Sequence, residues 1–143
     1  MGLYRHLLVA VELQDSGPPL LRRAAELAKQ FGARLSALHV VEYLPVDPSG
    51  DALLAAPMDL SRERTEAART RLRQWCEEAG LGADAATVSL GNPRVEIPRA
   101  AKDAGVDLIV VGHPPHRGLS ALFGHTESGV VQKAECDVLA LKL

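Results

Sequence analysis

The chain has 143 residues, of which 47% are hydrophobic and 24% are charged, and its formal net charge is -2. This length and composition are typical of a single domain with a hydrophobic core of its own. The small net charge gives no electrostatic argument for binding nucleic acid or a membrane surface, and the apolar runs are far shorter than the roughly 20 residues of a membrane-spanning helix.

The first part of the chain alternates between short apolar runs and a longer amphipathic one. Residues 6–11, HLLVAV, form a continuous apolar run, as expected for a strand that is buried on both faces. The next segment, SGPPLLRRAAELAKQFG, predicts a helix because it begins with a serine and two prolines and ends at Gly32. Residues 33–42 predict a second strand, and the prolines and glycine of residues 43–57 predict an excursion over the surface.

The middle of the chain predicts a long charged helix followed by a strand. Residues 59–80 alternate Glu and Arg in a way that is typical of a solvated helix face, and we read no binding function into these charges. Asp59 or Ser61 is expected to cap this helix, and Gly80 to end it. Residues 85–91 predict the third strand.

The segment NPRVEIPRAAKDAG, residues 92–105, predicts another helix with an asparagine cap and a proline at its first position. Pro98 conflicts with a regular helix there, because proline lacks the backbone N–H and its ring clashes with the preceding turn. Two alternatives follow: the helix is kinked at Pro98, or it begins near Ile97.

The last part of the chain predicts a strand at residues 107–112, a helix from about 126 to 134 and a final strand at residues 136–143. Strands and helices that alternate along the chain require a parallel sheet with right-handed crossovers. We therefore predict one domain, residues 1–143, with the α/β fold of an open five-stranded parallel sheet and helices on both faces, of the Rossmann-like kind.

In such sheets ligands bind beyond the carboxyl ends of the strands, where the strand order reverses. This rule places Glu12, residues 39–42 and the loop of residues 112–129 at the same edge of the molecule. In that loop, Gly112, Gly118 and Gly124 precede a helix, which suits the binding of an anion to backbone N–H groups. Simple turn chemistry explains the glycines equally well.

The loop also holds three histidines, His113, His116 and His125. No cysteine or acidic residue in the loop completes a familiar zinc spacing, so we predict no metal and ordinary exposed histidines. Ser120 and Ser128 lack the glycines of a nucleophile elbow, and no pair of carboxylates is placed for acid–base catalysis. We therefore predict that the protein is not an enzyme. A small α/β hydrolase or transferase remains as an alternative function.

The two cysteines, Cys76 and Cys136, lie far apart in the sequence. The first residues lack the apolar region and cleavage site of a signal peptide. We therefore expect a cytoplasmic protein in which both thiols are buried and inert.

The chain resembles the universal stress protein family, and its A-like members in particular. The segments that carry the resemblance are YRHLLVAVELQ, ARLSALHVVE, SLGNPRVEI, DLIVVGH and CDVLALKL. The resemblance covers essentially the whole chain. Members that bind ATP resemble one another in a loop written G-x2-G-x9-G-[S/T] and in an Asp at the end of the first strand. Here Gly112 matches the first glycine, but Pro115 stands at the second, and Gly124 matches the third only in a loop one residue shorter. His125 replaces the Ser or Thr, with Thr126 beside it, and Glu12 replaces the Asp.

The resemblance implies two readings of the function. The first is a homodimeric cytoplasmic regulatory or protective protein of the stress response, with weak or no ATP binding. The alternative is a nucleotide sensor that binds ATP or AMP, with Mg²⁺ accompanying ATP. In that alternative Glu12 holds the ribose, backbone groups of Val40 and Val41 meet the adenine, and the phosphates lie along the loop at Gly112, His113, Gly118, Gly124, His125 and Thr126. The plain alternatives are a solvated carboxylate for Glu12 and core packing for the valines.

The final segment, CDVLALKL, is apolar and contains no proline. At the edge of a sheet such a strand exposes unpaired backbone groups, and the simplest cover is the same strand of a second copy, antiparallel about a two-fold axis. The resemblance implies the same dimer. The expected interface residues are Cys136, Val138, Leu139, Ala140 and Leu141.

Overall fold

The structure is a computed structural model, and it describes residues 3–42, 57–113 and 129–143. The elements follow one another in the predicted alternation of strands and helices. In chain order they are β1 (His6–Ala10), α1 (Gly17–Phe31), β2 (Arg34–Val41), α2 (Pro57–Glu78), the 3-10 turn η1 (Ala83–Ala85), β3 (Ala86–Leu90), α3 (Pro93–Asp103), β4 (Leu108–His113) and β5 (Asp137–Lys142). Residues 129–133 are helical and form the described part of the helix expected before the last strand.

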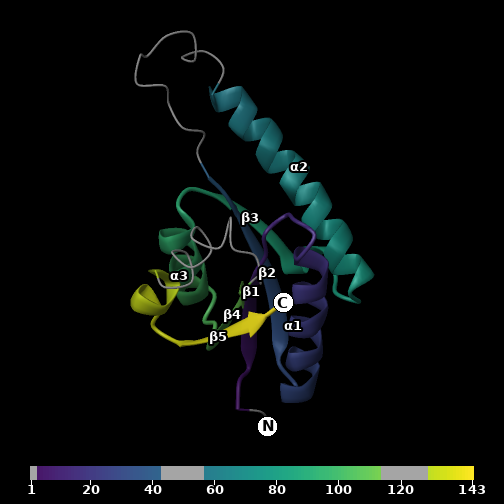
Figure 1. The fold of residues 1–143 in the computed structure, drawn as a ribbon, viewed down its shortest axis with the longest axis vertical. Coiled ribbons are helices and arrows are strands. Elements are labelled where there is room, and N and C mark those ends of the chain that lie inside the picture. Colours follow the sequence, from purple (N-terminus) through teal and green to yellow (C-terminus); the bar gives the residue numbers. More distant parts are fainter. Residues whose placement is uncertain (1–2, 43–56, 114–128) are drawn as a thin grey trace.

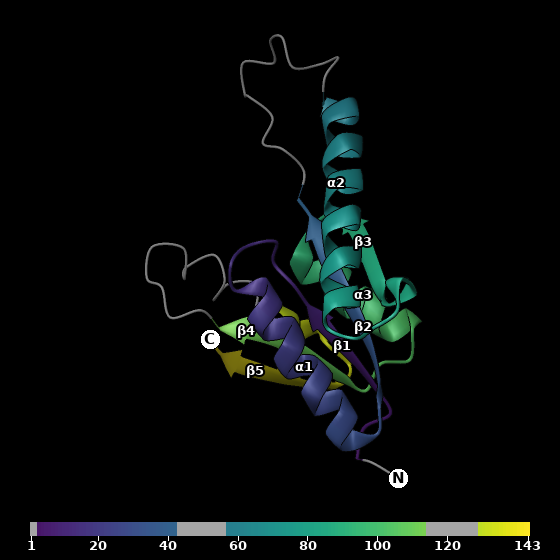
Figure 2. The same cartoon turned by 90° about the vertical axis from the view of Figure 1, so that its right-hand side faces the viewer.

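The five strands form one parallel sheet in the order β3-β2-β1-β4-β5, which confirms the predicted fold class. The order reverses between β1 and β4, since β2 and β3 lie on one side of β1 and the later strands on the other. Helices α1 and α2 cover one face of the sheet, and α3 and the helix of residues 129–133 cover the other (Figures 1 and 2). None of the helices in the described part of the chain combines the length and apolar character that crossing a bilayer requires.

Two hydrophobic clusters fill the layers, because successive residues of each strand face opposite sides of the sheet. On the α1 and α2 side, Leu7, Val9 and Val110 pack against Leu21 and Leu72. Each such side chain, fully buried, contributes roughly 1.5–3 kcal/mol relative to leaving it exposed. The second cluster lies under α3 and the helix of residues 129–133, and contains Leu8, Leu38, Val40, Ile97, Ala101, Val106, Ile109, Val111 and Val130.

Helix α2 begins earlier than the sequence pattern indicated. Pro57 is its first residue, so the helix extends into the segment expected to be an excursion, and the expected caps Asp59 and Ser61 lie inside the helix. Proline suits the first helical position because its fixed φ is already helical and its missing N–H has no partner there. The helix ends at Glu78, and Gly80 follows with a positive φ of 86°.

Helix α3 contains Pro98 in its interior, so the alternative start near Ile97 is wrong. The helix begins at Pro93, and the side chain of Asn92 caps it by accepting a hydrogen bond from the Arg94 backbone N–H at 2.9 Å. Pro98 removes one backbone donor from the helix. The burial of Ile97 and Ala101 against the sheet holds the helix across that gap.

Candidate functional site

The carboxyl edge of the sheet brings Glu12 and Gly112 to the same side of the molecule. Glu12 follows β1, Gly112 lies near the end of β4, and the two parallel strands are neighbours with Val9 aligned with Val110. Both strands flank the point at which the strand order reverses, which is where parallel sheets open a crevice for ligands. The predicted common edge is therefore confirmed for these two residues.

Glu12 is half-buried between the ends of the first two strands. Loss of solvent is the main cause that raises the pKa of this carboxyl, and the nearby Glu42 carboxylate raises it further. The segment after β1 is tightly held, because a Cβ atom at Gly17 would lie 2.6 Å from the Glu12 carbonyl oxygen and 2.4 Å from a ring carbon of Trp75. Glu12 is therefore a half-buried carboxyl that holds its proton more tightly than a freely solvated one does.

The side chains of Val40 and Val41 belong to the core, with exposed fractions of 8% and 3%. The Val41 carbonyl accepts a hydrogen bond from Gly91 of the neighbouring segment at 2.9 Å. The Leu38 carbonyl accepts a hydrogen bond from the Val11 N–H, so the backbone of Leu38 faces β1. Backbone groups alternate in direction along a strand, so the backbone of Val40, two residues later, also faces the β1 side. Strand β1 ends at Ala10 and therefore does not extend far enough to pair with Val40. Of these two valines, Val40 therefore turns its backbone toward the β1 side, whereas Val41 turns its backbone toward β3.

Gly112 has a packing role in this structure. A Cβ atom there would lie 2.8 Å from the Leu143 side chain and 3.1 Å from that of Leu20. The glycine thus lets these two leucines close over the end of β4, independently of any ligand. His113 follows at the strand end, where its carbonyl accepts a hydrogen bond from the Leu143 N–H at 3.1 Å.

The remaining loop residues of the predicted phosphate site lie outside the described residues. These are Pro115, Gly118, Gly124, His125 and Thr126, together with the histidine His116 and the serines Ser120 and Ser128. Their convergence on Glu12 stays a prediction.

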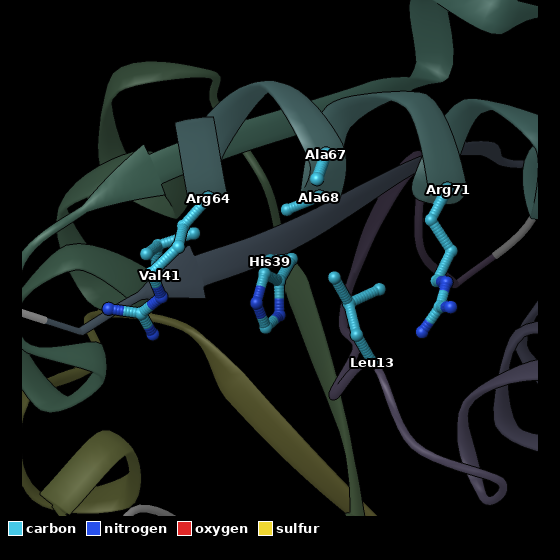
Figure 3. A pocket seen from close by; sticks show the side chains of 7 residues that line it. All are labelled: Leu13, His39, Val41, Arg64, Ala67, Ala68 and Arg71. Atoms are coloured by element: carbon cyan, nitrogen blue, oxygen red, sulfur yellow. The ribbon is translucent and has the colours of Figure 1, made fainter. Parts of the chain in front are cut away.

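A cleft of about 410 Å³ lies between α2 and the sheet (Figure 3), and we call it the α2 cleft. Its walls come from the segment after β1, from the end of β2 and from two turns of α2. It is lined by Leu13, His39, Val41, Arg64, Ala67, Ala68 and Arg71. Sequence reasoning missed it, because the charges of α2 were interpreted as a solvated face. No feature of the sequence separates Arg64 and Arg71 from the other arginines of α2.

His39 is fixed in one tautomer at the floor of this cleft. Its ring Nδ1 lies 2.7 Å from the Val11 carbonyl oxygen, so Nδ1 carries the proton and donates it. Loss of solvent is the main cause that lowers the pKa of His39, and the Arg64 charge lowers it further against the opposing effects of the Val11 carbonyl and Glu42. His39 is therefore a neutral imidazole at physiological pH.

A serine–histidine pair occurs at the opposite end of the sheet. The Ser36 hydroxyl lies 2.7 Å from Nε2 of His6, the separation of a nucleophile and its base. His6 is only 6% exposed, however, and its Nδ1 faces Arg34 at 3.2 Å and the Ala104 carbonyl rather than an orienting carboxylate. The pair ties β1 to β2, and its imidazole is buried without the carboxylate that would orient a catalytic base.

The thiols show no sign of activation. Cys76 is fully buried, as predicted, and burial raises the pKa of its thiol to about 11. Cys136 is only half-buried, contrary to the prediction, although loss of solvent also raises its pKa. Within the described ranges, no group of three His, Cys, Asp or Glu residues is arranged to hold a metal ion.

The sequence model of the universal stress protein family matches residues 3–142. The chain belongs to the universal stress protein family. This confirms the resemblance drawn from the strand ends. Universal stress protein A homolog 2 of Coxiella burnetii is 34% identical over 145 aligned positions, which cover 100% of this chain and 98% of that protein.

Solved structures of universal stress proteins share the fold. The universal stress protein UspA from Lactobacillus plantarum superposes with a TM-score of 0.77 at 28% identity, over 96% of this chain and 97% of that chain. A universal stress protein solved in complex with cAMP superposes with a TM-score of 0.64 at 20% identity, over 97% of each chain. At that identity the second likeness concerns the fold alone.

Proposed function

We propose that this universal stress protein is a regulatory or protective protein without catalytic activity, which works in the cytoplasm as a homodimer and binds ATP weakly or not at all. The observation that carries the proposal is the position of β5. It is an edge strand of the sheet, paired with β4 on one side.

The free side of β5 is suited to a second copy of itself. Ala140 is exposed, Val138 and Leu139 are half-buried, and Leu141 is buried in the protein's own core. Such an edge is a template for another strand, and pairing two copies of β5 antiparallel about a two-fold axis covers both edges at once. In this arrangement the backbone makes the interface, while Leu141 stabilises the fold of each subunit.

Weak ATP binding is supported by the roles that the matching residues already have. Gly112 is explained by its packing against Leu20 and Leu143. Pro115, at the place of the second glycine of the ATP-binding pattern, has no N–H to give to a phosphate. Fewer backbone donors for the phosphates lower the affinity for a triphosphate.

A second candidate function, an adenine-nucleotide sensor, is favoured by a different observation. The half-buried Glu12 follows β1, which borders the strand reversal, and Val40 lies near the carboxyl end of the neighbouring strand β2. These are groups that accept ribose hydroxyls and meet a base edge. A universal stress protein of the same fold was solved in complex with cAMP, which supports an adenine nucleotide as the class of ligand.

The dimer is tested by Ala140→Lys, which places a charge on the exposed edge without disturbing the core. We expect the wild type to sediment as a dimer and the variant as a monomer. The matched control is Ala83→Lys, the same change at an exposed alanine beside the other end of the sheet. A monomeric wild type, or a variant that remains dimeric, would refute the β5 interface.

Calorimetric titration with ATP and Mg²⁺, and separately with cAMP, decides between the two candidates. The absence of a binding signal at millimolar nucleotide concentration agrees with the leading proposal. Micromolar binding that is lost in both Glu12→Ala and Gly124→Val would establish the sensor instead. Hydrolysis of esters or phosphoesters that a single Ser or His substitution abolishes would overturn both.

A further inference from the structure

We propose that the α2 cleft is a binding site for a small planar molecule that carries an acidic group, and that this site is separate from the nucleotide crevice at the carboxyl edge. The cleft volume of about 410 Å³ falls in the range of sites for small molecules. Its lining combines an apolar floor with three polar side chains at defined positions, as such sites do.

The positive charge of the cleft comes from one face of α2. Arg64 and Arg71 are seven residues apart, which is two helical turns, so their Cα atoms lie about 10 Å apart along the helix axis. In Figure 3 both guanidinium groups extend from α2 toward the side on which His39 and Leu13 lie, one at either end of the cleft. An acidic ligand therefore meets a cation at each end.

The two arginines differ in their hydrogen-bond partners. Arg64 donates to the Glu42 carbonyl oxygen at 3.0 Å, which ties the start of α2 to the end of β2. Arg71 has no hydrogen-bond or ion-pair partner in the part of the chain that the structure describes. Arg71 is thus the guanidinium available to a carboxylate, sulfonate or phosphate, to which it can donate two parallel hydrogen bonds.

The middle of the cleft has small apolar side chains and leaves room for an apolar body. Ala67 and Ala68 lie between the arginines, and their small side chains leave the space that longer residues would fill. Leu13 and Val41 complete the apolar lining. A fused-ring molecule in this space removes apolar area from water and brings an acidic substituent within reach of Arg71.

His39 adds one directional group. Its Nδ1–H is committed to the Val11 carbonyl, and its Nε2 has no partner among the described residues. Because the imidazole lines the cleft, Nε2 is an acceptor for an N–H or O–H of the ligand. The chemical class that fits is therefore a planar aromatic acid with a donor group on its ring system.

Anilinonaphthalene sulfonate is a suitable probe, since it has fused rings, an N–H donor and one sulfonate. Phenylnaphthylamine has the same rings and N–H without the sulfonate, so it separates the charge contribution from the apolar one. Fluorescence titration of the wild type is expected to show tighter binding of the sulfonate than of the neutral analogue. Equal affinities for the two probes would overturn the proposed role of the arginines.

The location is tested with paired variants of α2. Arg71→Gln should weaken sulfonate binding by about three- to tenfold, the range for one charge-assisted contact partly screened by solvent, and leave the neutral analogue unchanged. Arg73→Gln removes the same charge from an exposed position of the same helix outside the cleft, and should change neither. If both variants lose sulfonate affinity to the same extent, or if neither loses any, the sulfonate binds elsewhere.

Ala67→Leu keeps the charge and fills the cleft, so it should weaken both probes while leaving the circular dichroism of the protein unchanged. Unaltered binding in this variant would exclude the cleft. Saturating ATP or cAMP should not displace the sulfonate. Competitive displacement would overturn the claim of a separate site, and would do so independently of whether β5 forms the dimer.

Discussion

Adding one methyl group at Gly17 tests how the segment after β1 is held in place. Gly17 is the first residue of α1, and its missing side chain lets Trp75 of α2 lie directly against the turn that carries Glu12. In Gly17→Ala the new Cβ would lie 2.4 Å from a Trp75 ring carbon and 2.6 Å from the Glu12 carbonyl oxygen. Both separations are too short for non-bonded atoms, so either the ring or the turn must move.

Two opposing effects decide whether Gly17→Ala raises or lowers the free energy of unfolding. Alanine is better than glycine in a helix by roughly 0.5–1 kcal/mol, so the change alone predicts a small gain. Forcing a methyl group into a packed site costs typically 1–3 kcal/mol. Because one of the two obstacles is backbone, we expect the second effect to prevail, with a net loss of about 1–2 kcal/mol in the free energy of unfolding, or roughly 3–6 °C in Tm.

Urea unfolding followed by circular dichroism measures this loss. Gly82→Ala is the matched control, because its new Cβ would meet only the movable carboxylate of the exposed Asp84. The double variant Gly17→Ala with Trp75→Leu should lose less than the sum of the single variants, since the smaller side chain relieves one clash. A Gly17→Ala protein as stable as the wild type, or additive losses in the double variant, would refute the packing argument.

Three further predictions follow from the buried polar groups and the thiols. Burial and the Arg34 charge hold the pKa of His6 below its ordinary value of 6.5, so the folded state binds this proton less readily than the unfolded state. Stability should therefore decline as the pH falls below 6.5, and His6→Gln should show a shallower decline in Tm measured across that range. Asn92→Ala should lower the unfolding free energy by about 1 kcal/mol in thermal unfolding, whereas Asn92→Asp, which keeps the capping oxygen, should not. At mildly alkaline pH a thiol reagent should modify Cys136 while Cys76 reacts only as fast as the protein unfolds, and rapid modification of Cys76 would contradict its burial.

The strands could be predicted because they are continuous apolar runs between turn residues. HLLVAV and DLIVVG each became a strand buried on both faces. Their alternation with helices also determined the parallel sheet and placed Glu12 and Gly112 at one edge. Helix ends were less predictable where proline occurs, because proline is compatible with a first helical turn at Pro57 and is also tolerated inside α3 at Pro98.

The α2 cleft could not be predicted, since it depends on which face of α2 meets the sheet. Arg64 and Arg71 are themselves exposed and have the same sequence context as Arg62 and Arg73. Only the packing of Leu72 and Cys76 into the core turns these two arginines toward His39. The role of Gly112 was missed for a similar reason, because the leucines that cover it, Leu20 and Leu143, are far away in the sequence.

The central position of β1 has a consequence for synthesis on the ribosome. Of the five strands, β1 is made first and lies in the middle of the finished sheet, and its second neighbour, β4, begins only at Leu108. Until that residue leaves the exit tunnel, the β4 side of β1 keeps its backbone N–H and C=O groups without their native partners. Translation arrest before Leu108 should therefore yield fragments that depend on chaperones and aggregate when released, while chains that are only a few codons longer begin to close the gap.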